Sequence, residues 1–181
     1  MKKGQILVSN YILINDIEFN KTLILIVESN NEGIVGFVFN KESEYQLSDI
    51  DEKLKGIDLK IYKGGPVMID TLHFIHRFNK FLKNSSKVTN EIYWGSEFEK
   101  ALELIKSNKL KKDDIKFFIG YSGWDKNQLK DEIENGSWHI LKKVNDNDIL
   151  ESKSNLWKAK IEELGEYFKI WSNSPENPNL N

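Results

Sequence analysis

Short runs of apolar, mostly β-branched residues recur along this chain, and polar turns separate them. The first three span residues 5–14, 22–28 and 34–41, and the second reads TLILIVE. Runs of this length and composition predict β-strands. Asn30, Asn31 and Gly33 lie between the second and third runs, where they predict a hairpin. The chain must therefore build a sheet from short strands.

Other segments complete a mixed set of elements. Four more strands are predicted at residues 59–65, 71–78, 115–120 and 138–141. Helices are predicted after Ser48 up to Gly56, from a capping box of Ser96 and Glu99, and over 125–136. A last helix is predicted over 156–171, with one apolar stripe made by Trp157, Ile161, Leu164, Phe168 and Trp171. Because strands and helices do not alternate regularly, a single α+β domain is favoured over a Rossmann fold or a barrel of alternating strands and helices.

The length of 181 residues suits one buried core. We expect the domain to span residues 1–172 and the polar, proline-bearing tail 173–181 to be disordered. The N-terminal apolar run is broken by Ser9, Asn10 and Asn15, which does not fit a signal peptide. Since no segment is long enough to span a membrane, we expect a cytoplasmic protein that makes no membrane contact.

Composition excludes some chemistries and disfavours others. The chain has no cysteine, so disulfides and thiolate nucleophiles are excluded. Its net charge is −2, and Arg77 is its single arginine. Arginine is the usual reader of guanine edges, so direct nucleic-acid binding is disfavoured.

Gly64 and Gly65, in the segment YKGGPV, are the first glycine feature. Two successive glycine amides can form an anion-binding nest. The segment lacks the spacing of a phosphate-binding loop, and Pro66 removes one donor. A tight turn between strands is therefore the favoured interpretation, with the nest as the alternative.

The three histidines do not predict a metal site. His73 and His76 would share a face on a helix but point to opposite faces of the predicted strand. Neither an HExxH motif nor a suitably spaced third ligand accompanies them or His139. We expect neither a metal nor another cofactor.

The segment GYSGW places Ser122 after a predicted strand, as in a nucleophile elbow. That motif needs a glycine two residues before and two residues after the serine. Gly120 meets the first condition, but Trp124 stands at the second position. Ser122 is therefore expected in a tight turn. No catalytic residue is assigned, because the sequence does not assemble an acid, a base and a nucleophile.

GGPV at 64–67 and GYSGWxxxQLxxEI at 120–133 together resemble the YqgE/AlgH family, over roughly residues 4–140. The resemblance implies a bacterial, cytoplasmic α+β domain with a mixed, bifurcated sheet curled into a pseudo-barrel and flanked by helices. The family is largely uncharacterised, and its link to transcriptional regulation rests on its name. Val27 and Ser29 stand where members commonly carry a Cys-x-His pair, so redox or metal chemistry at those positions is not available here.

Two functional hypotheses follow. The first is a non-enzymatic accessory or regulatory protein that binds an unknown protein partner; it predicts an exposed apolar patch and no deep polar cleft. The second is a small-ligand or nucleotide/anion-binding protein that uses both glycine segments, which should then converge around a pocket. Its candidate ligand-binding residues are Gly64, Gly65, Tyr121, Ser122, Gln128 and Glu132. The sequence does not indicate an oligomeric state.

Overall fold

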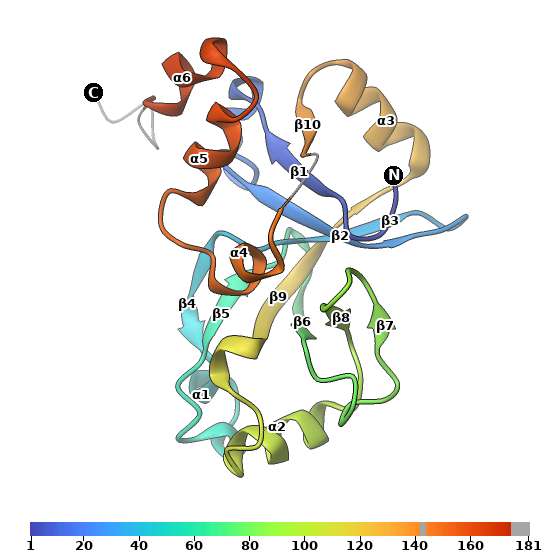
Figure 1. Ribbon diagram of the computed structural model, residues 1–181, viewed down its shortest axis with the longest axis vertical. Helices are drawn as coiled ribbons and strands as arrows, with labels where there is room; N and C mark the ends of the chain where they lie inside the picture. The colour runs from blue at the N-terminus through green and yellow to red at the C-terminus, as the bar shows by residue number, and fades with distance from the viewer. Residues whose placement is uncertain (142–143, 175–181) are drawn as a thin grey trace.

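A computed structural model describes residues 1–141 and 144–174 of the protein as a curled sheet with helices packed around it (Figure 1). The strands are β1 (Ile6–Ser9), β2 (Leu23–Ser29), β3 (Ile34–Val38), β4 (Glu42–Gln46), β5 (Lys60–Lys63), β6 (Val67–His76), β7 (Ser86–Lys87), β8 (Tyr93–Trp94), β9 (Ile115–Trp124) and β10 (Trp138–Leu141). The α-helices are α1 (Leu47–Ile50), α2 (Phe98–Lys106), α3 (Lys126–Glu134), α4 (Asp146–Glu151), α5 (Leu156–Glu162) and α6 (Glu166–Ser172). Short 3₁₀ turns lie at η1 (Tyr11–Leu13), η2 (Glu52–Leu54) and η3 (Lys112–Asp114).

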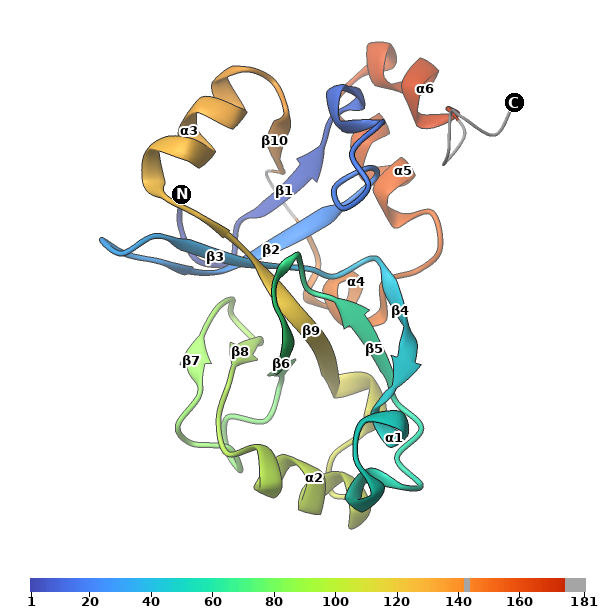
Figure 2. The same ribbon diagram turned by 180° about the vertical axis from the view of Figure 1, so that it is seen from behind.

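The sheet branches at β9. The strand order is β10-β1-β2-β3-β9-β6-β8-β7, with β4 and β5 off this path. One edge of β9 is shared: residues 122–124 pair antiparallel with β3, and residues 117–119 pair parallel with β5. The other edge pairs with β6. In Figure 2, β9 runs from the lobe that holds β1–β3 into the lobe that holds β4–β8. The predicted α+β class and branched, curled sheet are confirmed.

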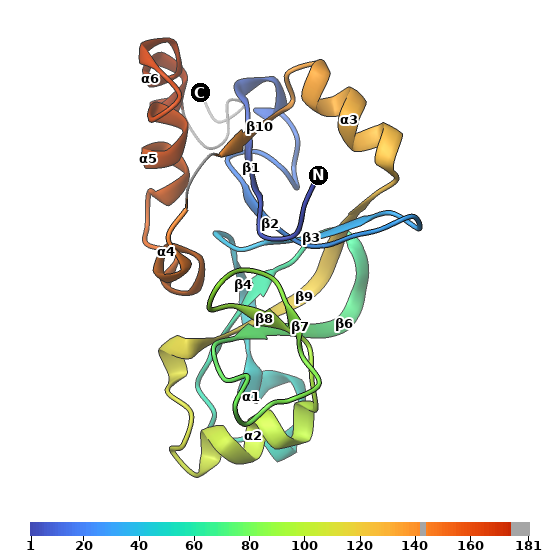
Figure 3. The same cartoon turned by 45° about the vertical axis from the view of Figure 1, so that its right-hand side comes forward.

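Helices cover both faces of the β1–β2 sheet (Figure 3). Leu23 and Leu25 of β2 face a core that includes Trp157 of α5. Ile24 and Ile26 face the opposite core, which includes Leu129 of α3. Because neither face of β2 meets solvent, the strand reads as a continuous apolar run and not as an alternating one.

Three local predictions are corrected by the structure. The first predicted strand, 5–14, ends at Ser9 and continues as the 3₁₀ turn η1. The predicted helix 156–171 is two helices, because Gly165 adopts a φ of 137° that no helix accommodates. Ser122 lies inside β9, not in a turn, because its strand pairs with β3 through Trp124.

The capping box at Ser96 is also wrong. Glu97 is the N-cap residue of α2, and its side chain makes no capping hydrogen bond. Ser96 has a φ of 116° and so lies outside the helix geometry altogether. The apolar face expected of this helix is present, since Leu102 and Ile105 are buried.

The predicted disordered tail, 173–181, falls mostly on residues 175–181, which lie outside the described residues. The domain boundary at 172 therefore stays a prediction. Within residues 1–141 and 144–174, no helix has the length and apolar character needed to cross a membrane.

Candidate functional site

The two glycine segments meet where the chain crosses over β9. β5 and β6 lie on opposite edges of β9, and residues 64–66 are the whole connection between them. A β-carbon on Gly64 would lie 2.1 Å from the carbonyl oxygen of Gly120, and one on Gly65 would lie 2.4 Å from the amide nitrogen of Ser122. Glycine is required here because two main chains pass in direct contact. The glycine pair does connect two strands as predicted, but the connection crosses over β9 and is not assigned as a turn.

The polar groups at this crossing bind one another. The Gly64 amide donates to the carbonyl of Ile119 at 2.8 Å, and the Gly64 carbonyl accepts from Val38 at 2.8 Å. The Ser122 hydroxyl donates to the same Gly64 carbonyl at 3.1 Å, and Ser122 is buried. The donor that an anion nest would need from Gly64 is thus engaged within the fold.

Gln128 and Glu132 form a separate cluster on α3. One carboxylate oxygen of Glu132 accepts hydrogen bonds from the indole nitrogens of Trp124, at 2.9 Å, and Trp138, at 2.8 Å. The other oxygen accepts from the Gln128 amide at 3.0 Å. This carboxylate holds α3 against β9 and β10. Of the six candidate ligand-binding residues, the structure brings Gly64, Gly65, Tyr121 and Ser122 together, while Gln128 and Glu132 take part in this clamp; a ligand at any of them stays a prediction.

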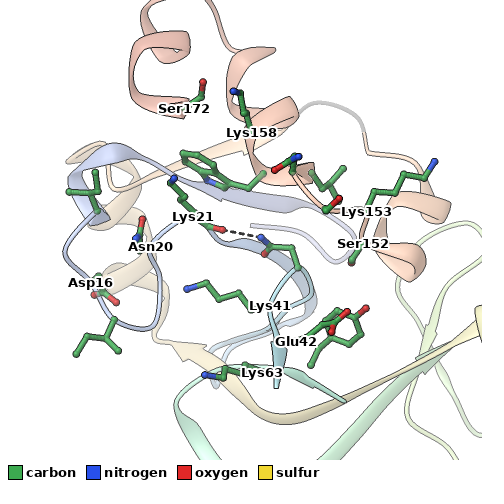
Figure 4. Close-up of a pocket in the computed structure, with 18 of the residues that line it drawn as sticks. Asp16, Asn20, Lys21, Lys41, Glu42, Lys63, Ser152, Lys153, Lys158 and Ser172 are labelled. Carbon is green, nitrogen blue, oxygen red and sulfur yellow. Dashed lines mark hydrogen bonds between the residues drawn. The ribbon is translucent and has the colours of Figure 1, made fainter. Parts of the chain in front are cut away.

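A polar cleft of about 930 Å³ opens elsewhere, between the loop before β2, the β3–β4 and β5 segments, and the C-terminal helices (Figure 4). We call it the lysine cleft. None of the six predicted residues lines it. Among the described residues, its charged lining consists of five lysines and two carboxylates, and amide and hydroxyl side chains surround them: Lys21, Lys41, Lys63, Lys153, Lys158, Asp16, Glu42, Asn15, Asn20, Asn40, Asn155, Ser152, Ser154 and Ser172.

Lys21, Lys41 and Lys63 gather around one opening of the cleft, whereas Lys153 points away from them (Figure 4). The ammonium groups of Lys21 and Lys41 donate to the main-chain carbonyls of Ser174 and Glu18. A carbonyl oxygen carries no net charge, so the bond to Ser174 does not neutralise the charge of Lys21. One of the two carboxylates, that of Glu42, is paired at 3.1 Å with Lys60 outside the cleft. Two of the lining lysines, Lys153 and Lys158, pair with carboxylates outside the lining, those of Glu151 at 3.7 Å and Glu162 at 4.0 Å. Lysines still outnumber carboxylates in the described lining, so the cleft favours anions in a chain whose net charge is −2.

A buried lysine lies behind the cleft wall. Lys116 of β9 donates to the carbonyls of Phe39, at 2.9 Å, and Ile149, at 2.7 Å, and also to the Ser152 hydroxyl. Its ammonium lies 3.8 Å from the ring centre of Tyr62. Burial lowers the pKa of Lys116, and the Glu42 carboxylate opposes that shift. These contacts fix Ser152 and Tyr62, which both line the cleft, against β9.

Sequence reasoning did not identify the lysine cleft. Its residues come from four separated stretches, 14–21, 40–42, 62–63 and 152–158, joined by Ser172. No stretch carries a local motif, and lysines are common throughout the chain. A signal would require knowledge of which loops meet, and that depends on the fold.

Comparison with known proteins places the chain among relatives of the same length. A family model described as AlgH-like matches residues 6–169. A UPF0301 protein of Cytophaga hutchinsonii is 34% identical over 183 residues, with 100% of both chains covered. A UPF0301 protein of Chlorobaculum parvum is 32% identical over 181 residues, covering 100% of this chain and 96% of the relative.

Two solved structures share the fold. A crystal structure of a Corynebacterium diphtheriae protein superposes with a TM-score of 0.77 at 19% identity, covering 96% of this chain and 93% of the other. The solution structure of the AlgH protein of Pseudomonas aeruginosa gives a TM-score of 0.71 at 21% identity, covering 95% and 93%. At these identities the likeness concerns the fold alone.

Proposed function

We propose, for a chain that belongs to the AlgH-like family, that it is a non-enzymatic protein which binds a small phosphorylated metabolite in the lysine cleft. The observation that carries the proposal is the charge of the lining, which in the described part of the chain holds five lysines and two carboxylates, with Lys21 and Lys63 at one opening. A concave surface lined by one sign of charge raises the local concentration of ligands of the opposite sign.

The lining also suits phosphate by its hydrogen-bonding groups. Lysine binds phosphate as a point charge with three donors, without the bidentate geometry of arginine. The cleft adds amide and hydroxyl groups from Asn15, Asn155 and Ser154, which can donate to phosphate oxygens. Asn40 is already committed, since it accepts from Leu23 and donates to the carbonyl of Lys21. It holds the two lysine-bearing segments together.

Calorimetric titration with inorganic pyrophosphate tests this proposal. We expect saturable binding to the wild-type protein that weakens as sodium chloride rises, because salt screens exposed charges. Lys63→Ala should weaken binding roughly tenfold, the worth of one charge-assisted contact. Lys109→Ala removes an exposed lysine outside the cleft and should leave the affinity unchanged.

A further variant separates this site from the glycine segments. Gln128→Ala should leave pyrophosphate affinity unchanged, because Gln128 does not line the cleft. Loss of binding in Gln128→Ala but not in Lys63→Ala would place the ligand beside α3 and overturn the cleft assignment. Absence of binding in the wild-type protein would overturn the function itself.

A second candidate function, an accessory or regulatory protein acting through protein contacts, is favoured by one exposed surface. Tyr11 stacks on Trp171 with ring centres 4.5 Å apart and meets Tyr167 edge-on at 6.1 Å. Ile12 and Ile170, the sequence neighbours of Tyr11 and Trp171, are 51% and 74% exposed. We call these five residues the aromatic patch. Exposed apolar side chains close to a ring cluster are typical of a protein-binding site.

Photo-crosslinking in cells tests the second candidate. A photoreactive residue at position 167 should yield one defined adduct, which Ile170→Asp should abolish by placing a charge in the contact. The same residue at position 130, on the exposed face of α3, serves as the control. Equal adducts from positions 167 and 130, or an adduct that survives Ile170→Asp, would argue against the patch.

A further inference from the structure

A second cavity, distinct from the lysine cleft, opens where β8 separates from β6. Continuing the register of β6 and β8 beyond the pair Ile75–Trp94 places Gly95 opposite Phe74, and the Gly95 amide does donate to the Phe74 carbonyl at 3.1 Å. Ser96 would come next, opposite His73, but there the chain turns away toward α2. The cavity left at this edge measures about 360 Å³.

The lining of this cavity is mostly apolar, and among the residues that the structure describes it includes no charged side chain other than His73 when protonated. Leu72, Phe74, Trp94 and Phe98 form its walls. His73 and Ser96 are the polar side chains of the lining. Burial lowers the pKa of His73, which favours the neutral ring. A ligand with a full charge would find no partner here, so the cavity suits a neutral molecule.

Two features of Ser96, its backbone conformation and its unpaired hydroxyl, each lower the stability of the folded protein. Its φ of 116° lies in a region that residues with a β-carbon rarely adopt. Its hydroxyl is buried and, within the part of the chain that the structure describes, has no hydrogen-bond partner. Native proteins leave few buried polar atoms unpaired, and each one calls for an explanation. The hydroxyl oxygen is out of reach of a water molecule where it lies, so it must turn to meet a molecule in the cavity. Serine has a single side-chain torsion, so this turn costs little entropy.

His73 offers a complementary acceptor. The Thr71 hydroxyl donates its proton to the Met68 carbonyl at 2.7 Å. The same hydroxyl lies 3.0 Å from Nε2 of His73, so it must accept there, and Nε2 carries the proton. Nδ1 of the neutral ring therefore keeps its lone pair. Ser96 and His73 both line the cavity, so a hydroxyl donor and an imidazole acceptor are the polar groups that its described lining can offer beside aromatic walls.

We infer that this cavity is a binding site for a neutral single-ring aromatic molecule that carries one hydroxyl group. The volume lies near the lower limit of about 300 Å³ for ligand pockets, which fits one ring. The ligand hydroxyl would accept from Ser96 and donate to Nδ1 of His73. Occupancy would satisfy the Ser96 hydroxyl that the fold leaves unpaired.

Three probes of nearly equal size test the inference: p-cresol, toluene and p-toluate. Binding is followed by amide NMR shifts of Gly95 and Ser96 at pH 7, where p-cresol is neutral because phenols ionise near pH 10. We expect saturable p-cresol binding at least about fivefold tighter than toluene binding, which is the factor for one neutral hydrogen bond. Ser96→Ala should bring p-cresol to within about twofold of toluene and leave toluene affinity unchanged.

Two further variants keep the test decisive if Ser96→Ala folds poorly. Ser96→Gly removes the hydroxyl at a φ that glycine tolerates, and it should have the same effect on p-cresol. Ser107→Ala changes an exposed serine at the far end of α2 and should have none. Tightest binding by p-toluate, equal binding of p-cresol and toluene, or no shift at Gly95 and Ser96 with any probe would each overturn the inference.

Discussion

The carboxylate of Glu132 accepts a hydrogen bond of 2.8 Å from the indole nitrogen of Trp138, across the junction between α3 and β10. The same oxygen accepts a second indole, that of Trp124 at the end of β9. Both tryptophans are buried, so their N–H groups cannot turn to water if the carboxylate is lost. The carboxylate of the half-buried Glu132 on α3 thus satisfies the indole N–H groups of two core tryptophans.

We therefore expect Glu132→Ala to lower the free energy of unfolding by about 3 kcal/mol, because hydrogen bonds to charged groups contribute about 1.5–3 kcal/mol each and are not additive. Glu132→Gln keeps one acceptor oxygen and should cost about half as much. Urea denaturation followed by tryptophan fluorescence measures both changes. Glu134→Ala, which removes a surface ion pair with Lys130, is the matched control and should change stability by less than about 1 kcal/mol. Similar losses for positions 132 and 134 would disprove the clamp.

The crossing of residues 64–66 over β9 gives a second prediction. A methyl group at Gly64 would overlap the Gly120 carbonyl, and the crossing cannot widen without breaking the pairing of β5 and β6 with β9. We expect Gly64→Ala to destabilise the protein by more than about 3 kcal/mol or to prevent folding. Gly56→Ala is the control: its φ is +85°, but a β-carbon there would meet no atom within 4 Å.

The control substitution carries only backbone strain, on the order of 1–2 kcal/mol. Thermal unfolding and soluble yield distinguish the two variants. If Gly64→Ala is no worse than Gly56→Ala, then main-chain contact does not explain the glycine pair, and its role as part of a ligand site regains weight.

The buried His76 ring gives a third prediction, which concerns how the stability of the protein depends on pH. The ring is buried, its Nδ1 accepts from the Phe78 amide at 2.9 Å, and its Nε2 lies 2.8 Å from the Ser85 hydroxyl. Burial lowers the pKa of His76 to about 4, against an unfolded value of 6.5, with the Gly95 carbonyl opposing the shift. Between these two values the unfolded chain binds the proton and the folded protein does not. Stability is therefore full above pH 6.5 and is lost as the pH falls toward 4, by up to about 3 kcal/mol.

Urea titrations at pH 7, 5.5 and 4.5 measure this loss. Burial lowers the pKa of His73 and His139 as well, so these residues add to the same trend. His76→Gln should reduce the difference between pH 7 and pH 4.5, even if it lowers stability at both. An unchanged difference would mean that His76 does not titrate as its surroundings imply.

Sequence patterns predicted the features that local chemistry determines. The run TLILIVE became β2 because its composition suits a strand covered on both faces. The break at Gly165 was missed because the apolar spacing of 156–171 continues across it. The lysine cleft could not be predicted, since its residues meet only through pairings between distant strands. Likewise, Ser96 has the residue type of a helix cap, and only its tertiary position reveals a strained backbone.

That strain gives the last prediction, in which one type of substitution has opposite effects at two sites. Ser96→Gly should raise the free energy of unfolding by about 1 kcal/mol, because it releases an unfavourable φ and removes a buried, unpaired hydroxyl. Ser107→Gly, at the end of the same helix and with a φ of −84°, should lower it by up to about 1 kcal/mol, because glycine gains freedom in the unfolded chain. Urea denaturation at pH 7 gives both values. Destabilisation by Ser96→Gly would show that the Ser96 side chain has a favourable interaction in the folded protein, and it would remove the unpaired hydroxyl on which the proposed aromatic site depends.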